Sequence, residues 1–129
     1  MKPDNNNYNW SEKTILIVED TDTSIMYYRA ALKKSKVKLV CAENGLQAVE
    51  LVKQGKHFDL ILMDINMPLL NGIEATKQIK SINPKIPVIV QTAYVLNDER
   101  IKSFEAGCDG FMAKPVKIQQ LFDTIESLL

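Results

Sequence analysis

Five polar residues of this sequence share one property: each stands at the carboxyl end of a short apolar run. They are Glu19, Asp20, Asp64, Thr92 and Lys114. If the runs are parallel strands, their carboxyl ends meet at one edge of a sheet and bring the five side chains to one site. Three carboxylates at one site repel one another, and a divalent cation relieves that repulsion. Because every acidic donor is an oxygen, with no His or Cys among the five, the pattern favours Mg²⁺.

The same groups suit phosphoryl transfer to a carboxylate. Asp64, on the central run, is the natural nucleophile. Lys114 would hold one phosphoryl oxygen as a mobile point charge, and the hydroxyl of Thr92 would donate a hydrogen bond to another. The charges also balance, because three carboxylates, one ammonium group and one Mg²⁺ sum to zero.

The apolar runs alternate along the chain with segments of helical period. The predicted strands are 14–18, 38–42, 60–63, 88–91 and 110–112, and the predicted helices are 23–34, 45–53, 72–82, 98–106 and 117–128. Strict alternation with short connections predicts an α/β fold with right-handed crossovers. The expected architecture is a doubly wound, five-stranded parallel sheet of order 2-1-3-4-5 with five helices, of the flavodoxin-like kind.

The composition is that of one globular domain. The chain has 129 residues, 46% of them hydrophobic, and its 16 basic residues balance 16 acidic ones. A net charge of zero gives no field that would draw the chain onto nucleic acid or anionic lipid, so neither is an expected partner. The apolar runs are too short to cross a bilayer and no secretory signal is present, so we expect a cytoplasmic protein. Cys41 and Cys108 fit neither a metal site nor a disulfide scaffold and are interpreted as small buried thiols.

Residues 1–13 are interpreted as a linker or tag. They contain Pro3 and four Asn residues and show no apolar periodicity. Trp10 is the residue there that is able to dock onto the domain, although a tethered aromatic of this kind is as often disordered. The domain itself is expected to span residues 14–129.

These motifs together resemble the receiver domain of two-component response regulators and hybrid histidine kinases. The resemblance covers residues 14–129 and rests on ILIVED at 15–20, LILMDINMP at 60–68 with Gly72, Thr92-Ala93 and Lys114-Pro115. It implies that Asp64 accepts a phosphoryl group from the phosphohistidine of a histidine kinase or histidine phosphotransfer domain. It also implies that Mg²⁺ is held by Glu19, Asp20, Asp64 and the backbone carbonyl of Asn66, and that a cis peptide before Pro115 aims Lys114 into the site.

The resemblance further implies a switch in which Thr92 moves toward the phosphoryl oxygens and Phe111 turns inward. This movement would remodel the face formed by residues 98–106, 110–112 and 117–128 and support phosphorylation-dependent homodimerisation there. Phe111 stands where Tyr is frequent in the family, so it has no hydroxyl to donate when turned inward. Glu19 likewise stands where Asp is more usual.

Two variable positions of the receiver pattern flank the path of water to the phosphorus, and here they are Asn66 and Tyr94. The small, polar Asn66 tolerates a water molecule. The bulky Tyr94 is expected to shield the acyl phosphate and lengthen its lifetime. In the alternative interpretation, Tyr94 points outward as part of a partner surface.

Three alternatives to a phosphoacceptor module are considered. The first is a flavodoxin-like FMN binder, suggested by the hydroxyls of Thr21, Thr23 and Ser24, although the two carboxylates before them would repel a phosphate. The second is an aspartyl-phosphate phosphatase, and the third is a receiver-like docking module that is never phosphorylated. We expect no turnover of external substrates, only the chain's own phosphotransfer and autodephosphorylation.

Other polar residues have simpler interpretations. Asp22 is taken first as a helix N-cap and only second as a metal ligand. His57 is interpreted as an exposed loop residue. The Lys33-Lys34 pair is interpreted as a solvated helix end that complements the helix dipole.

Overall fold

The computed structural model describes residues 8–93 and 97–129, in which parallel strands alternate with helices. The elements are β1 Thr14–Val18, α1 Asp22–Leu32, the 3₁₀ helix η1 Lys33–Ser35, β2 Lys38–Ala42, α2 Gly45–Lys53, β3 Leu60–Asp64, α3 Gly72–Ile82, β4 Val88–Thr92, α4 Asn97–Glu105, β5 Gly110–Ala113 and α5 Ile118–Leu128. All paired strands are parallel, in the order β2-β1-β3-β4-β5. The predicted fold class and strand order are confirmed.

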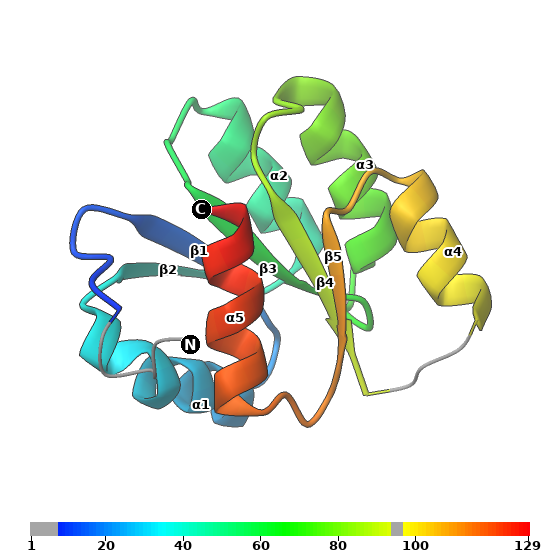
Figure 1. The fold of residues 1–129 in the computed structure, drawn as a ribbon. Helices are drawn as coiled ribbons and strands as arrows, with labels where there is room; N and C mark the ends of the chain where they lie inside the picture. The colour runs from blue at the N-terminus through cyan, green and yellow to red at the C-terminus, as the bar shows by residue number, and fades with distance from the viewer. Residues whose placement is uncertain (1–7, 94–96) are drawn as a thin grey trace.

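Alternate residues of each strand face opposite sides of the sheet and pack into two cores. Leu16 and Val18 of β1 pack with the buried faces of α2 and α3. Ile15 and Ile17 of the same strand pack with α1 and α5. Figure 1 shows α1 and α5 on one face of the sheet and α2, α3 and α4 on the other. The carboxyl ends of the strands therefore reach one common edge, where the predicted site residues stand.

Residues 8–13, which we call the N-terminal strap, pack on the domain and complete the core beside α5. Tyr8 and Trp10 are only 7% and 5% exposed. The Trp10 indole stacks on the Phe122 ring with the centroids 5.2 Å apart, and its Nε1 donates to Glu126 Oε2 at 2.9 Å. The Trp10 backbone amide donates to the carbonyl of Ser35 in η1 at 2.7 Å. The interpretation of residues 1–13 as a linker or tag is wrong for the strap, because its two aromatic rings bury apolar area that its Asn-rich composition conceals.

Replacing Trp10 by Ala is expected to lower the free energy of unfolding by about 2 kcal/mol, the transfer free energy of one large buried side chain. The loss stays at that level because a terminal strap can peel away without leaving a cavity. Trp10→Phe keeps the ring contact and loses only the hydrogen bond to Glu126, so it should cost about 1 kcal/mol. Urea unfolding followed by circular dichroism measures both variants. If Trp10→Ala unfolded at the wild-type midpoint, the strap would contribute nothing to the fold.

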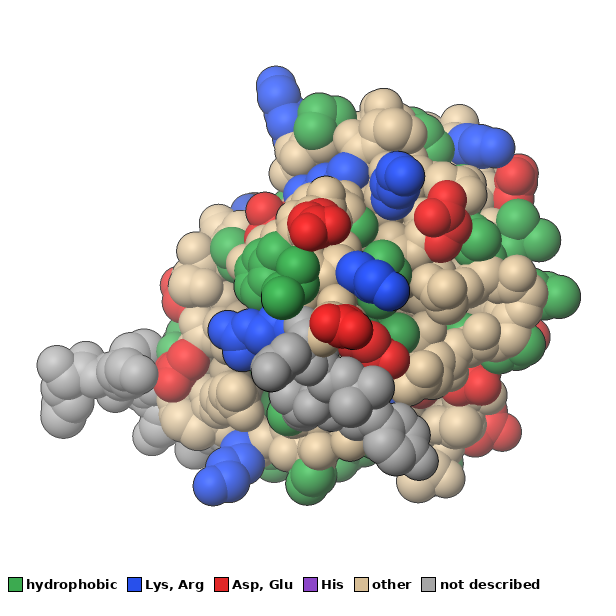
Figure 2. Space-filling view, turned by 90° about the vertical axis from the view of Figure 1, so that its right-hand side faces the viewer, with side chains coloured by type: hydrophobic (Ala, Val, Ile, Leu, Met, Phe, Trp, Pro, Cys, Tyr) green, Lys and Arg blue, Asp and Glu red, His purple; other side chains and the backbone are tan. Residues whose placement is uncertain are grey.

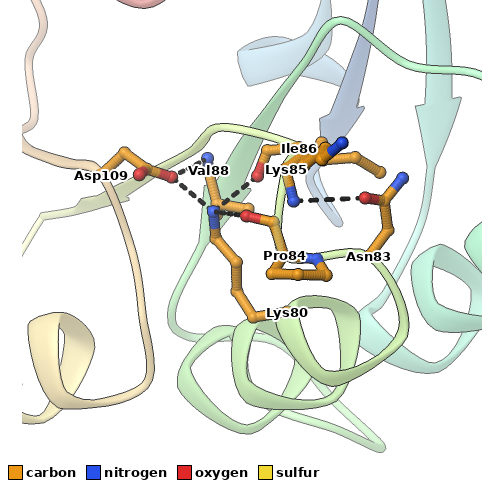
Figure 3. A network of polar contacts seen from close by, with 7 residues as sticks. All are labelled: Lys80, Asn83, Pro84, Lys85, Ile86, Val88 and Asp109. Carbon is orange, nitrogen blue, oxygen red and sulfur yellow. Dashed lines mark hydrogen bonds and ion pairs between the residues drawn. The ribbon is translucent and has the colours of Figure 1, made fainter.

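The amino edge of the sheet, opposite the predicted site, is held by Lys80 of α3 (Figure 3). Its ammonium group donates to the carbonyl of Ile86 at 2.7 Å and to Asp109 Oδ2, also at 2.7 Å. The same Asp109 oxygen accepts the amide of Val88, the first residue of β4. These contacts join the end of α3 to the starts of β4 and β5. The amino edge therefore has a structural role, and the functional loops are expected at the carboxyl edge.

The two thiols differ in environment. Cys108 is buried, and burial raises the pKa of its thiol to about 11, so the thiol is protonated at neutral pH. Cys41 is half-buried, and Arg29 Nη2 lies 3.3 Å from its sulfur. The expectation of a buried thiol is therefore wrong for Cys41, because β2 is an edge strand of the sheet. Among the described residues, none of the helices has both the length and the apolar character needed to span a membrane.

Candidate functional site

The structure brings together polar residues that stand at the carboxyl ends of four strands, β1, β3, β4 and β5. Glu19 follows β1, Asp64 and Thr92 are the last residues of β3 and β4, and Lys114 follows β5. Glu19 and Asp64 are only 1% and 6% exposed, whereas Asp20 is exposed. Buried carboxylates need partners, so the contacts of these groups decide what the site is able to do.

Lys114 supplies the positive charge of the site. Its Nζ donates to Glu19 Oε2 at 2.7 Å and lies 3.7 Å from Asp64 Oδ1. The Lys114 backbone amide donates to the carbonyl of Thr92 at 2.8 Å, and the Lys114–Pro115 peptide is cis. One ammonium group thus serves two buried carboxylates, which leaves a net negative charge at the site.

The remaining negative charge fits a divalent cation. Oxygen atoms of Glu19, Asp20 and Asp64 lie within 4.8 Å of one another. Burial raises the pKa of the Glu19 and Asp64 carboxyl groups, although Lys114 opposes that shift at both. An all-oxygen set of three carboxylates whose charge a single lysine does not compensate suits Mg²⁺.

The loop between β3 and α3 is tightly folded around the end of β3. Asn66 Nδ2 donates to Thr92 Oγ1 at 3.4 Å, which links this loop to β4. The amides of Met67 and Gly72 both donate to the carbonyl of Ile65, at 3.1 and 2.9 Å. The loop closes on the N-cap of α3, where Asn71 Oδ1 accepts the amide of Glu74 at 2.9 Å. These bonds set where the backbone of residue 66 stands relative to Asp64.

Phe111, the predicted switch residue, is half-buried on β5 and packs against the core beneath α2 and α3. The Arg100 guanidinium carbon of α4 lies 5.8 Å from the centre of the Phe111 ring and 5.9 Å from that of Phe104. Figure 2 views the side that carries α4 and shows hydrophobic side chains at the surface among charged ones. Ile101 and Phe104 are the exposed large hydrophobic residues of α4.

Of the other residues singled out from the sequence, Asp22 lines a pocket together with Glu19 and Asp20. Tyr94, the expected shield, lies outside the described residues. Thr21, and not Asp22, is the N-cap of α1, because the helix begins at Asp22. His57 is an exposed loop residue, as predicted, and its Nε2 lies 3.0 Å from Asp59 Oδ1.

A buried polar pair beneath the site was missed from the sequence. The hydroxyl of Tyr28 in α1 donates to Oε1 of Gln91 in β4, and both side chains are buried. The signal was present, because Gln91 is the one amide that follows the apolar residues Val88 to Val90 in a strand expected to be buried on both faces. A buried amide in such a run needs an internal partner, and periodicity does not say which helix provides it.

Comparison with known proteins agrees with this geometry. The family model described as the response regulator receiver domain matches residues 15–126. The polar-differentiation response regulator DivK of Brucella anthropi is 33% identical over 119 residues, which cover 91% of this chain and 96% of that protein. The DivK protein of Brucella ovis is equally similar, at 33% identity over the same shares.

Solved structures give the same result. The receiver domain of the sensor histidine kinase PA1611 from Pseudomonas aeruginosa, with a magnesium ion coordinated in its active site cleft, superimposes with a TM-score of 0.83 at 30% identity. That match covers 90% of this chain and 96% of the other. The chemotaxis protein CheY4 of Vibrio cholerae, 24% identical, shares the fold with a TM-score of 0.82 over 91% of this chain and 98% of its own.

Proposed function

This chain belongs to the response regulator receiver domain family, the phosphoacceptor signalling domains of two-component systems, and we propose that Asp64 is its phosphoacceptor. The observation that carries the proposal is the position of the Asp64 carboxylate. It is nearly buried at the carboxyl edge of the central strand β3, 3.7 Å from the Lys114 ammonium and beside two further carboxylates. No other carboxylate among the described residues has both this central position and these neighbours.

The proposed step is the transfer of a phosphoryl group from a phosphohistidine. An oxygen of Asp64 attacks phosphorus, so a P–O bond forms while the P–N bond breaks and its electron pair returns to the imidazole ring. Lys114 holds one phosphoryl oxygen as a point charge, and the Thr92 hydroxyl donates to another. The positions of these side chains at the ends of β3, β4 and β5 support the proposed roles.

The residues that would hold Mg²⁺ are Glu19, Asp20, Asp64 and the backbone carbonyl of Asn66. The bound cation would neutralise the charge of the phosphoryl oxygens. The one-methylene difference between Glu and Asp is consistent with Glu19 taking part through a water molecule. In the unphosphorylated protein the Lys114 ammonium already pairs with Glu19, so it competes with the cation and favours weak binding.

The proposed phosphoryl donor is a histidine kinase or a histidine phosphotransfer domain. A pocket of about 460 Å³ opens beside Lys114, with walls formed by Tyr27, Tyr28 and Val116. Met26 and Tyr27 of α1 and Ile118 of α5 are exposed large hydrophobic side chains on the helices that border it. An apolar surface next to the acceptor suits a partner protein that must bring its histidine to Asp64. We place this exchange in the cytoplasm and expect no turnover of external substrates.

The proposed output is a population shift on the opposite side of the site. Thr92 moves toward the phosphoryl oxygens, Phe111 turns inward, and the face formed by α4, β5 and α5 changes. Exposed Ile101 and Phe104 of α4 support this face as the surface for a partner or for a phosphorylation-dependent homodimer. The contact of Arg100 with Phe111 would have to change for the ring to turn.

The test of the function is labelling of the wild-type chain by acetyl phosphate, followed by intact mass. With Mg²⁺ we expect one added phosphoryl group that hydroxylamine removes, as it does from an acyl phosphate. With EDTA in place of Mg²⁺ the chain should not become labelled, because the three carboxylates would then repel the incoming phosphoryl group. If the chain took no label with Mg²⁺, or if the label resisted hydroxylamine, the proposal would be wrong. The alternative of a docking module that is never phosphorylated would then be favoured.

The lifetime of the acyl phosphate gives a separate prediction. In the receiver pattern two variable positions flank the path of water to the phosphorus, and in this sequence they are Asn66 and Tyr94. We expect Tyr94 to shield the phosphorus. Tyr94→Ala should therefore speed autodephosphorylation several-fold while the Mg²⁺ affinity stays the same. Decay of the label after removal of acetyl phosphate measures the effect, with Tyr8→Ala in the N-terminal strap as the control for loss of a tyrosine away from the site. Equal or slower decay in Tyr94→Ala would mean that this side chain does not shield.

A further inference from the structure

The buried pair of Tyr28 and Gln91 leaves one hydrogen bond unmade. Gln91 is fully buried on β4, the neighbour of the central strand β3, and its Oε1 accepts the Tyr28 hydroxyl. Its Nε2 is buried and has no hydrogen-bond partner within residues 8–93 and 97–129. A buried donor without a partner is costly, whereas an apolar side chain of the same length would avoid that cost.

This unpaired amide stands directly beside the proposed site. In the β3–β4 ladder Gln91 is the register partner of Asp64, so the two side chains emerge on the same face of the sheet. The backbone carbonyl of Gln91 accepts the amide of Ile65 at 3.2 Å. The next residue along β4 is Thr92. Gln91 therefore shares its backbone contacts with the segments that carry the acceptor and the switch.

Tyr28 connects Gln91 to the apolar surface proposed for the phosphoryl donor. It lies on α1 next to Tyr27, whose hydroxyl donates to the carbonyl of Val116 beyond Lys114. Burial raises the pKa of Tyr28, and the negative charges of Glu19 and Asp64 raise it further, so its hydroxyl lies within the electrostatic reach of both carboxylates. One buried hydrogen bond thus ties α1 to the residue that precedes Thr92.

We propose that Gln91 is a positioning residue for the switch: its amide lacks a partner in the unphosphorylated packing and gains one when Thr92 moves toward the phosphoryl group. The unmade bond raises the free energy of the unphosphorylated packing and so favours the switched one. A movement of Thr92 carries Gln91 with it, since the two residues are adjacent in β4. The inference rests on the proposed function of Asp64.

The decisive variant is Gln91→Met, which keeps the length of the side chain and removes the amide. We expect a urea midpoint near that of wild type, because the removal of the unpaired donor offsets the loss of the Tyr28–Gln91 hydrogen bond. We also expect beryllofluoride, added with Mg²⁺ as the phosphoryl mimic, to bind about tenfold more weakly, as the loss of one buried hydrogen bond predicts. Backbone amide shifts of residues 88–93 and 110–116 follow the titration. A purely structural role would leave the beryllofluoride affinity at its wild-type value whatever the midpoint, and that result would overturn the proposal.

Two further variants separate the outcomes. Gln119→Met makes the same exchange on the exposed face of α5 and should change neither quantity. Tyr28→Phe should lower the urea midpoint and alter beryllofluoride affinity in the wild-type background, but it should have no further effect on that affinity in Gln91→Met. If Gln91→Met failed to fold, an unchanged affinity in Tyr28→Phe would itself overturn the coupling. If the wild-type chain bound beryllofluoride but the variants did not differ from it as expected, only this inference would fail. If the wild-type chain did not bind beryllofluoride, both the proposed function and this inference would be refuted.

Discussion

Replacing Asp64 by Asn is expected to abolish labelling by acetyl phosphate. The amide oxygen of Asn is a poor nucleophile, and removal of the attacking group from a covalent reaction usually costs several orders of magnitude. We therefore expect the labelling rate to fall by more than about 100-fold. The measurement is the intact-mass assay with Mg²⁺ under the conditions that label the wild-type chain.

The variant must lose its label without losing its fold, and the electrostatics of the site predict that it does. Burial raises the pKa of the Asp64 carboxyl group, so the folded state disfavours the charged form. A carboxyl group of this kind stabilises the fold most below its ordinary pKa, and that contribution is lost as pH rises through the raised value. Because Asn is neutral, Asp64→Asn should be at least as stable as wild type at pH 7 without divalent metal.

Asp98→Asn is the matched control, since Asp98 is an exposed carboxylate on α4. It removes the same charge away from the buried pair and should label like wild type. Wild-type labelling of a folded Asp64→Asn would place the acceptor on another residue. A folded but unlabelled Asp98→Asn would show that net charge, and not a particular nucleophile, controls the reaction.

The fold was predictable because the strands are buried on both faces. All five residues of β3 and of β4 are buried, so these segments read as short continuous apolar runs bounded by polar residues. The observed ends differ from the predicted ones by one or two residues, as at β3, which includes Asp64, and α1, which gives way to η1 at Lys33. Hydrogen bonding defines these ends, and the polarity of a terminal residue does not report it.

The site was predictable as a set of positions but not as a set of contacts. The parallel strands place Asp64 and Lys114 at one edge of the sheet, whatever conformations their side chains adopt. That Lys114 approaches Glu19 more closely than Asp64, at 2.7 against 3.7 Å, depends on side-chain orientation that no spacing encodes. The contacts of Tyr28 with Gln91 and of Trp10 with Glu126 join residues far apart in sequence, so local pattern could not find them.

Close packing of Gly72 against the end of β3 supports the position of the proposed acceptor Asp64. Replacing Gly72 by Ala should therefore disturb both the fold and the acceptor. A Cβ atom at Gly72 would lie 2.0 Å from the carbonyl oxygen of Asp64 and 2.8 Å from its carbonyl carbon. Both are backbone atoms, so no side chain can turn aside to make room. The end of β3 or the start of α3 must shift instead, which displaces the Asp64 carboxylate from Lys114.

Gly72→Ala is therefore expected to lower the free energy of unfolding by about 3 kcal/mol, the upper end of the usual cost of overpacking. In the fraction that stays folded, labelling by acetyl phosphate should slow by about 100-fold, because a displacement of about 1 Å at a reacting group has that effect. Urea unfolding and the intact-mass assay, the latter at a temperature where circular dichroism shows a folded chain, measure the two effects separately.

Gly110→Ala is the control, because it adds the same methyl group where the space allows it. A Cβ atom there would meet Ile89 Cγ1 at 3.5 Å and Thr124 Cγ2 at 3.6 Å, both ordinary van der Waals contacts with side chains. We expect this variant to fold and to label like wild type. If Gly72→Ala behaved the same way, the β3–α3 loop would be able to relax without moving Asp64, and the close approach of α3 to the end of β3 would not be what positions the acceptor.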